Sequence, residues 1–334
     1  MKTFFLVGLV MGMGVWGAQA GPEGEWRVED GVEAFHFETP ELKGMIVGRD
    51  ERELGKGYGK HGIRGLVHVP TGSDLSAPEG PVGAKRRHQG MVNLYRVYGA
   101  TETLGALRDD QAEVERLEDG ARLIWAPTEE RPVAVTATWR VTGPGQIDVE
   151  MVAVPERAIE NFEVLPATYV DVLMEKGMYA EGDGEGEVEI LRQMETPGER
   201  PQYPFFPLGE EARAMQEKSG RMGSSWIWPS YVHEGVAALP VIFAENDEVE
   251  ILLMADPESV SAVCVTPKPE TGEPEEWNSV GQHSALYFSL FGRDVEAGEE
   301  CRSRMRLVVV PAGGDGDEGL EARHRGLYEG FLGE

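Results

Sequence analysis

Runs of alternating apolar and polar residues, many rich in β-branched side chains, recur along nearly the whole chain. Successive side chains of a β-strand point to opposite faces, so a period of two is typical of strands with one buried face. Gly- and Pro-containing turns separate the runs. The pattern predicts strands at 32–38, 91–98, 121–126, 133–141, 147–154, 187–191, 237–244, 249–255, 260–266, 285–291 and 302–310.

Helical patterning is confined to two short segments. Residues 210–218 predict a surface helix, and Leu320, Leu327, Tyr328 and Phe331 share one helical face, which predicts a closing helix over 317–332. Because a sheet buries its apolar face against another layer, many strands with few helices indicate stacked sheets. The predicted class is all-β: a large antiparallel β-sandwich with a short C-terminal helix, formed by residues 21–334 as a single domain.

The first twenty residues have the pattern of an export signal. Lys2 precedes an apolar stretch over 4–16, and Ala18-Gln19-Ala20 is a small-residue cleavage site. The apolar stretch is short for a membrane span. We therefore expect residues 1–20 to be a signal peptide and the protein to be secreted or periplasmic, without a membrane span.

The charge of the chain is strongly negative, with one local exception. The chain has 31 Lys and Arg against 59 Asp and Glu, a net charge of −28, which argues against nucleic acid as a partner. The window 55–98 nevertheless holds seven Lys and Arg against two acids. Such a cluster can focus an anionic ligand into a cleft, or its cations can simply pair with nearby acids and neutralise the surface. The Arg side chain matches carboxylate or sulfate groups.

The two cysteines, Cys264 and Cys301, lie in predicted strands that could be neighbours in a sheet. An oxidising compartment would let them pair, so a disulfide and two buried thiols both remain open. No cofactor is expected. No metal site is expected either, because the acidic loops at 183–187 and 315–317 lack the converging oxygens of a calcium loop.

An aromatic segment at 224–235 is a second candidate for ligand binding. In an extended conformation Trp226 and Trp228 share one face and Tyr231 and His233 share another. Aromatic rings offer apolar platforms to sugars, and His233 beside Glu234 could transfer protons. The alternative interpretation is a set of core aromatics with a capping histidine.

Residues 134–173 resemble the middle of galactose-mutarotase-like β-supersandwich proteins. Val135-Thr-Ala-Thr-Trp-Arg-Val141, then Gln146-Ile-Asp-Val-Glu-Met-Val-Ala-Val154, then Ile159-Glu-Asn-Phe162 to Tyr169-Val170 carry the resemblance. Residues 291–309 are similar to the last strands of that group, and His61-Gly62 with Gly65 is similar to its His-Gly-Gly segment. The resemblance implies a carbohydrate-active sandwich.

Together these features lead to a hypothesis of a secreted carbohydrate-binding or carbohydrate-active protein, acting on an acidic glycan by proton abstraction, as a lyase does. Asp171, an acid in an apolar strand, is a further residue of interest. The alternatives are a non-catalytic glycan-binding or structural sandwich protein and a sugar epimerase, so whether the chain is an enzyme stays open. The candidate catalytic residues are His88, Tyr95, His233 and Glu234. The candidate substrate-binding residues are His61, Arg87, Asn93, Arg96, Trp226, Trp228 and Tyr231.

Overall fold

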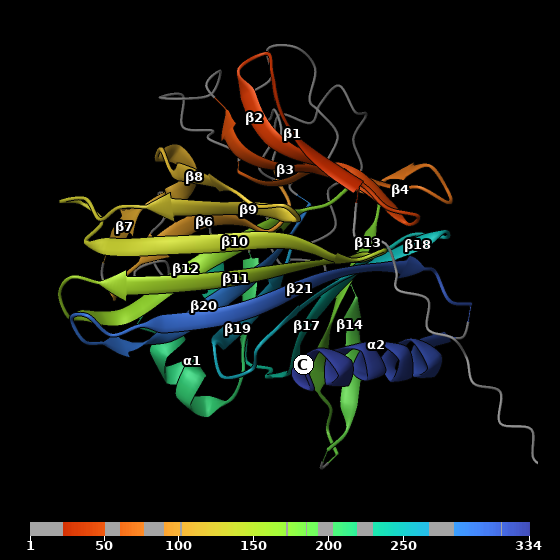
Figure 1. The fold of residues 1–334 in the computed structure, drawn as a ribbon. Coiled ribbons are helices and arrows are strands. Elements are labelled where there is room, and N and C mark those ends of the chain that lie inside the picture. Colours follow the sequence, from red (N-terminus) through yellow and green to blue (C-terminus); the bar gives the residue numbers. More distant parts are fainter. Residues whose placement is uncertain are drawn as a thin grey trace, which may run out of the picture.

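The computed structural model describes residues 23–50, 61–76, 90–100, 102–171, 173–184, 186–192, 203–218, 230–266, 284–314 and 316–334. These residues form three β-sheets and two α-helices, and one α-helix closes the chain (Figure 1). The predicted class, an all-β antiparallel sandwich with a C-terminal helix, is confirmed. Residues 1–20, the predicted signal peptide, lie outside the described part. Within that part, no helix has the length and apolar character needed to cross a membrane.

The largest sheet has nine antiparallel strands. Its strand β11 (Gln146–Pro155) shows how the sequence sets the structure, because Ile147, Val149, Met151 and Ala153 are buried while the residues between them are partly exposed. In sheet order the strands are β14 (Val188–Arg192), β13 (Glu175–Glu181), β17 (Ala237–Glu245), β18 (Val249–Ala255), β21 (Cys301–Pro311), β11, β10 (Val133–Gly143), β9 (Gly120–Trp125) and β8 (Glu113–Arg116).

The second sheet has seven strands and lies behind the first in Figure 1. Only its edge pair, β15 with β16, is parallel. In sheet order the strands are β16 (Ser230–Val232), β15 (Tyr203–Pro207), β19 (Val260–Val265), β20 (Ala285–Val295), β12 (Ile159–Tyr169), β6 (Asn93–Tyr98) and β7 (Thr103–Gly105). A short 3-10 helix, η1 (Leu107–Asp109), follows β7.

The N-terminal strands form a third, five-stranded sheet beside the other two (Figure 1). Only its second strand was predicted from the sequence, because the other strands lack a clean alternation of period two. Its strands, in order, are β1 (Glu23–Glu29), β2 (Val32–Glu38), β3 (Leu42–Asp50), β4 (Gly62–His68) and β5 (Ser73–Asp74).

The main hydrophobic core lies between the nine- and seven-stranded sheets and continues under the five-stranded one. Trp125 and Trp139 are its largest side chains, and each is almost fully buried. Their indole N–H groups donate to the backbone oxygens of Leu107 and Val92, so burial leaves neither donor unsatisfied.

Two helices cover the outer sides of the sheets. Helix α2 (Gly316–Leu332) packs Leu320, Tyr328 and Phe331 against the nine-stranded sheet (Figure 1). Helix α1 (Glu210–Gln216) packs against the seven-stranded sheet. Both helices lie where the sequence predicts them.

The structure corrects two predictions about local features and adds a strand that the sequence analysis did not predict. Despite its prolines, Tyr203–Pro207 forms the buried strand β15 near the sheet edge, where proline is tolerated. Cys264 and Cys301 are not strand neighbours: they lie in the seven- and nine-stranded sheets, and both are free thiols. Asp171 is not a buried strand acid, because it follows β12 and its carboxylate accepts the N–H of Leu173 in a turn.

Candidate functional site

The outer face of the seven-stranded sheet, turned away from the main core, carries a cluster of tyrosines. We call Tyr95, Tyr98, Tyr169, Tyr203 and Tyr287 the tyrosine face. It gathers five of the nine tyrosines in the chain from four strands. The ring centroid of Tyr287 lies 6.5 Å from that of Tyr95 and 6.4 Å from that of Tyr169. Such packing supplies both apolar surface and phenol groups.

A β-bulge in β6 brings a cation onto this face. Arg96 lies opposite Leu165 and Leu94 opposite Pro166 on β12, so Tyr95 is an extra residue without a partner. Regular alternation would send Tyr95 and Arg96 to opposite faces. The bulge instead lets both side chains point outward, with the Arg96 guanidinium 4.9 Å from the centre of the Tyr95 ring.

A second arginine contacts the same ring. The guanidinium of Arg108, in η1, lies 4.0 Å from the centre of the Tyr95 ring. Two cations thus flank one aromatic ring, an arrangement stabilised by cation–π attraction. Both arginines are partly exposed while Tyr95 is 7% exposed. These three residues are therefore the part of the face that solvent or a ligand can reach.

The guanidinium of Arg96 is not fully satisfied by the described residues. Its Nε is buried and has no hydrogen-bond partner. In the described part of the chain the Arg96 side chain makes no hydrogen bond and no ion pair. A partly buried guanidinium without an acceptor is costly, and an anionic ligand would supply the missing acceptor.

Burial keeps the phenols of Tyr169 and Tyr287 protonated. Desolvation is the largest influence on Tyr169 and raises its pKa to about 12, although Arg108 and Arg96 act in the opposite direction. Desolvation also raises the pKa of Tyr287 well above its ordinary value. At neutral pH both groups are hydrogen-bonding phenols rather than bases.

A buried polar network closes one end of the face. Gln216 of α1 donates to Glu163 of β12 at 2.5 Å and to Ser289 of β20 at 2.9 Å. Glu163 lies opposite Tyr98 in the sheet, so the network is continuous with the tyrosine face. It fixes α1 on the sheet and satisfies a fully buried carboxylate.

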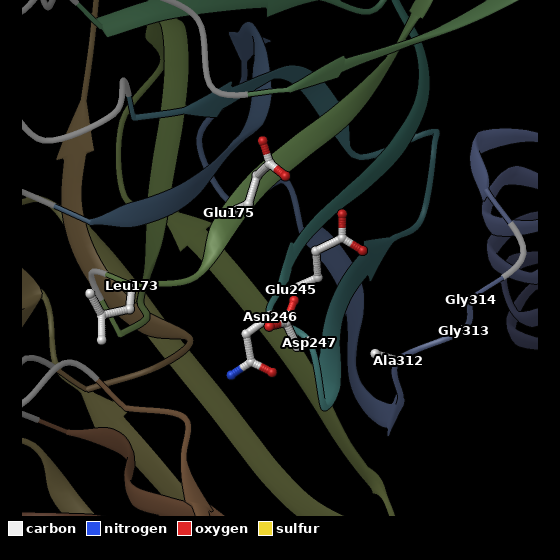
Figure 2. A pocket seen from close by; sticks show the side chains of 8 residues that line it. All are labelled: Leu173, Glu175, Glu245, Asn246, Asp247, Ala312, Gly313 and Gly314. Carbon is white, nitrogen blue, oxygen red and sulfur yellow. The ribbon is translucent and has the colours of Figure 1, made fainter.

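A surface cleft of about 520 Å³ lies elsewhere, at the turn between β17 and β18 (Figure 2). Glu175 and Glu245 project side by side there, and Arg192 forms ion pairs with both. No residue predicted as a site residue lines it. The lining residues are Leu173, Glu175, Glu245, Asn246, Asp247, Ala312, Gly313 and Gly314.

His61 and Asn93 serve the fold. His61 is 6% exposed, packs edge-on to Trp125 and Trp139, and accepts the N–H of Leu94 through Nε2. Asn93 is 3% exposed and donates to the backbone oxygens of Gly90 and Ala167, which joins β6 to β12. Both side chains are thus engaged in hydrogen bonds that hold β6 in place.

His61 leads to a prediction about acid stability. Burial, followed by the charges of Arg64 and Arg108, lowers its pKa to about 3, whereas the unfolded chain binds this proton near pH 6.5. The contribution of neutral His61 to the free energy of unfolding should therefore be fully present above pH 6.5 and be lost as the pH drops from 6.5 towards 3. His61→Gln, which keeps an acceptor for Leu94, should remove about 2 kcal/mol of the loss between pH 6.5 and 4.5. Urea denaturation at several pH values measures this, and an unchanged pH profile in the variant would contradict it.

The second predicted group does not join the tyrosine face. His233 stacks on Phe206, a main-core residue, at 4.0 Å, and its Nδ1 accepts the N–H of Gly235. Tyr231 lies 6.2 Å from His233, at the far edge of the sheet from β6, and Glu234 is exposed. The predicted sites Arg87, His88, Trp226 and Trp228 lie outside the described residues.

Of the residues named from the sequence, the structure brings together Tyr95 and Arg96. It adds Arg108, Tyr169, Tyr203 and Tyr287, which the sequence analysis did not single out. The sequence does contain a signal for Tyr287. It lies between Leu286 and Phe288, which face the main core, so the alternation of β20 puts Tyr287 on the opposite face of the sheet.

No protein-family model and no curated protein matches the sequence. Solved structures resemble the fold: a galactose 1-epimerase from Lactobacillus acidophilus NCFM (9% identity, TM-score 0.47, covering 88% of this chain and 100% of that one). A GalM/aldose epimerase homologue from C. elegans has 8% identity and a TM-score of 0.49, and the match covers 82% of this chain and 97% of that one. A putative aldose 1-epimerase from Escherichia coli K12 has 12% identity and a TM-score of 0.45, and the match covers 84% of this chain and 100% of that one. These neighbours are of the mutarotase-like kind that the sequence resembles. The likeness is one of fold alone.

Proposed function

We propose that the protein binds an anionic carbohydrate at the exposed end of the tyrosine face. The observation that carries the proposal is Arg96, a partly exposed guanidinium with a buried Nε and no acceptor in the described residues. Its planar fork suits a carboxylate or sulfate. The ring of Tyr95, itself 7% exposed, holds the guanidinium of Arg108 close to it as well, so a second cation lies near the same point.

A neutral sugar or a simple apolar ligand fits these residues less well. Arg96 and Arg108 place two positive charges around one ring in a chain with a net charge of −28. A negative charge between them would relieve their mutual repulsion and replace lost hydration. Export of the chain, as residues 1–20 predict, would give it access to extracellular acidic polysaccharides.

If the protein is a lyase, the guanidinium of Arg96 would neutralise the carboxylate of the uronate. The proton at the carbon beside the carboxylate would pass to a base, and Tyr95, whose ring centre lies 4.9 Å from the Arg96 guanidinium, is the candidate among the described residues. His61 and His233 are less suited, because each has a ring nitrogen that accepts a backbone hydrogen bond.

The experiment is a panel of uronate and sulfated polysaccharides, with binding and product formation measured in parallel. Binding with a rise in ultraviolet absorbance from unsaturated product supports the lyase. Binding without product supports a non-catalytic glycan-binding protein, and proton exchange at the anomeric carbon in NMR supports an epimerase. Absence of binding to every anionic glycan in the panel would overturn the proposal.

A further inference from the structure

Strand β6 is one residue longer than the segment of β12 that it pairs with. Leu165 and Pro166 are adjacent on β12. Their partners on β6 are Arg96 and Leu94, so the register skips Tyr95. Such a β-bulge interrupts the ladder of backbone hydrogen bonds, and bulges recur beside functional sites. The extra residue therefore needs an explanation.

The rest of β6 alternates regularly when Tyr95 is left out. Leu94 and Val97 lie in the main core. Arg96 lies opposite Leu165 of the outer face, and paired residues of antiparallel strands share a face. The order at 94, 96 and 97 is thus inward, outward and inward, as in an ordinary strand. Tyr95 is an insertion into that order, and it adds a second outward side chain directly before Arg96.

Side chains, rather than the ladder, bond the backbone next to the insertion. The N–H of Leu94 donates to Nε2 of His61 at 2.9 Å, and the backbone oxygen of Ala167 accepts from the side chain of Asn93 at 3.0 Å. Val92 has a φ of 48°, a left-handed conformation that is strained for a β-branched residue. The fold thus holds β6 in place here with strain and with two side chains, and this fixes the position of the extra residue.

The inserted ring brings two cations together. Arg96 comes from β6 and Arg108 from η1, and their guanidiniums lie 4.9 Å and 4.0 Å from the centre of the Tyr95 ring. The indole of Trp125 donates to the backbone oxygen of Leu107, which ties η1 to the core. Cation–π attraction to one ring offsets part of the repulsion between the two charges. Both arginines are partly exposed, so a ligand can reach them from solvent.

We propose that Tyr95 is a positioning residue, inserted into β6 to hold Arg96 and Arg108 for a glycan with two neighbouring anionic groups. The inference rests on the proposed function and narrows its ligand to sugars such as sulfated uronates. One carboxylate matches a single guanidinium fork, whereas a carboxylate with a nearby sulfate places one anion beside each arginine. Because Tyr95 is only 7% exposed, its effect on binding acts through the two cations rather than through direct contact with a sugar.

Isothermal titration tests the selection with a uronate disaccharide that carries one sulfate and with its unsulfated counterpart. Wild type should bind the sulfated sugar about tenfold more tightly. Tyr95→Leu keeps the length of β6 but removes the ring, so it should reduce this preference to less than about twofold. A purely structural role of Tyr95 would not change the ratio of the two affinities.

The outcomes separate the inference from the proposed function. Equal affinities of wild type for the two sugars, or an unchanged preference in Tyr95→Leu, would overturn the inference and leave the proposed function standing. Absence of binding to either sugar would overturn both.

A deletion tests the insertion itself. Removal of Tyr95 should leave a regularly alternating β6 and a protein that still unfolds in one cooperative thermal transition. The control is deletion of Val149 from β11, a strand whose burial alternates without interruption. Deletion there turns the following side chains to the wrong faces, so that variant should not fold. Loss of the cooperative transition in both variants would show that Tyr95 is part of the regular strand and would overturn the inference.

Discussion

Replacing His324 with leucine is expected to lower the free energy of unfolding by about 3–5 kcal/mol. His324 lies on the buried side of α2 with 0% exposure. Its Nδ1 lies 2.7 Å from the hydroxyl of Tyr179 on β13, and its Nε2 lies 3.0 Å from Oε2 of Glu250 on β18. Leucine fills much of the volume but leaves a buried carboxylate oxygen and a buried phenol without this partner.

Glu250 is the reason for the large effect. The other oxygen of its carboxylate accepts from Arg323 and from the N–H of Gly313, so helix, sheet and connecting loop meet at one buried charge. Desolvation is the largest single influence and raises the pKa of Glu250, but the hydrogen bonds from His324, Arg323 and Gly313 and the charge of Arg323 together lower it. Removing one member therefore weakens the attachment of α2 as a whole.

Urea denaturation of the two proteins measures the effect as a shift in midpoint at constant slope. The matched control is Arg325→Gln on the same helix, where a partly exposed ion pair with Glu321 is lost and the change should stay within about 0.5 kcal/mol. Equal midpoints for His324→Leu and Arg325→Gln would contradict the prediction.

Replacing Lys176, a buried lysine of β13, with methionine should instead stabilise the protein, by about 3 kcal/mol at pH 7. The folded state binds this proton with a pKa of about 8, whereas the unfolded chain binds it near 10.4. The penalty for burying the ammonium is thus complete below pH 8 and disappears as the pH rises from 8 towards 10.4. Methionine is similar in length and suits the apolar surroundings.

The pH profile distinguishes this effect from a change in packing. Wild-type stability should contain a component that rises between pH 8 and 10, and Lys176→Met should lack it. Lys43→Met, on an exposed lysine that pairs with Glu38, is the control and should retain it. A variant that is less stable than wild type at pH 7, or that keeps the rise, would show that Lys176 is buried at no cost.

The sequence predicts regular strands well and local irregularities poorly. The alternation in β11 follows from one buried face, and the nearly continuous apolar run of β18 follows from two. Both patterns are visible in the residues themselves. The bulge at Tyr95 depends on how β6 pairs with β12, which is about seventy residues away in sequence. No local pattern records that pairing, so the shared face of Tyr95 and Arg96 appears only in the fold.

Buried polar residues escaped prediction for a related reason. The buried face of α2 was predicted from its apolar residues. His324 lies on the same face, but a polar residue type does not indicate burial. Its burial depends on Tyr179 and Glu250, partners from distant strands that satisfy both ring nitrogens. From its residue type Lys176 would likewise be expected at the surface. Its burial follows only from the fold, in which Ser284, directly before β20 of the seven-stranded sheet, contacts its ammonium group.

The central claim is that Arg96 binds the anionic group of a sugar. Isothermal titration of a uronic-acid oligosaccharide, with its methyl-esterified form as the uncharged counterpart, tests this most directly. Arg96→Gln should weaken binding of the acidic form 10- to 100-fold, or about 1.4–2.7 kcal/mol. Arg302→Gln, which removes an exposed arginine paired with Glu300, should leave binding unchanged. Equal affinity of wild type and Arg96→Gln, or equal affinity for the charged and esterified sugars, would contradict the account.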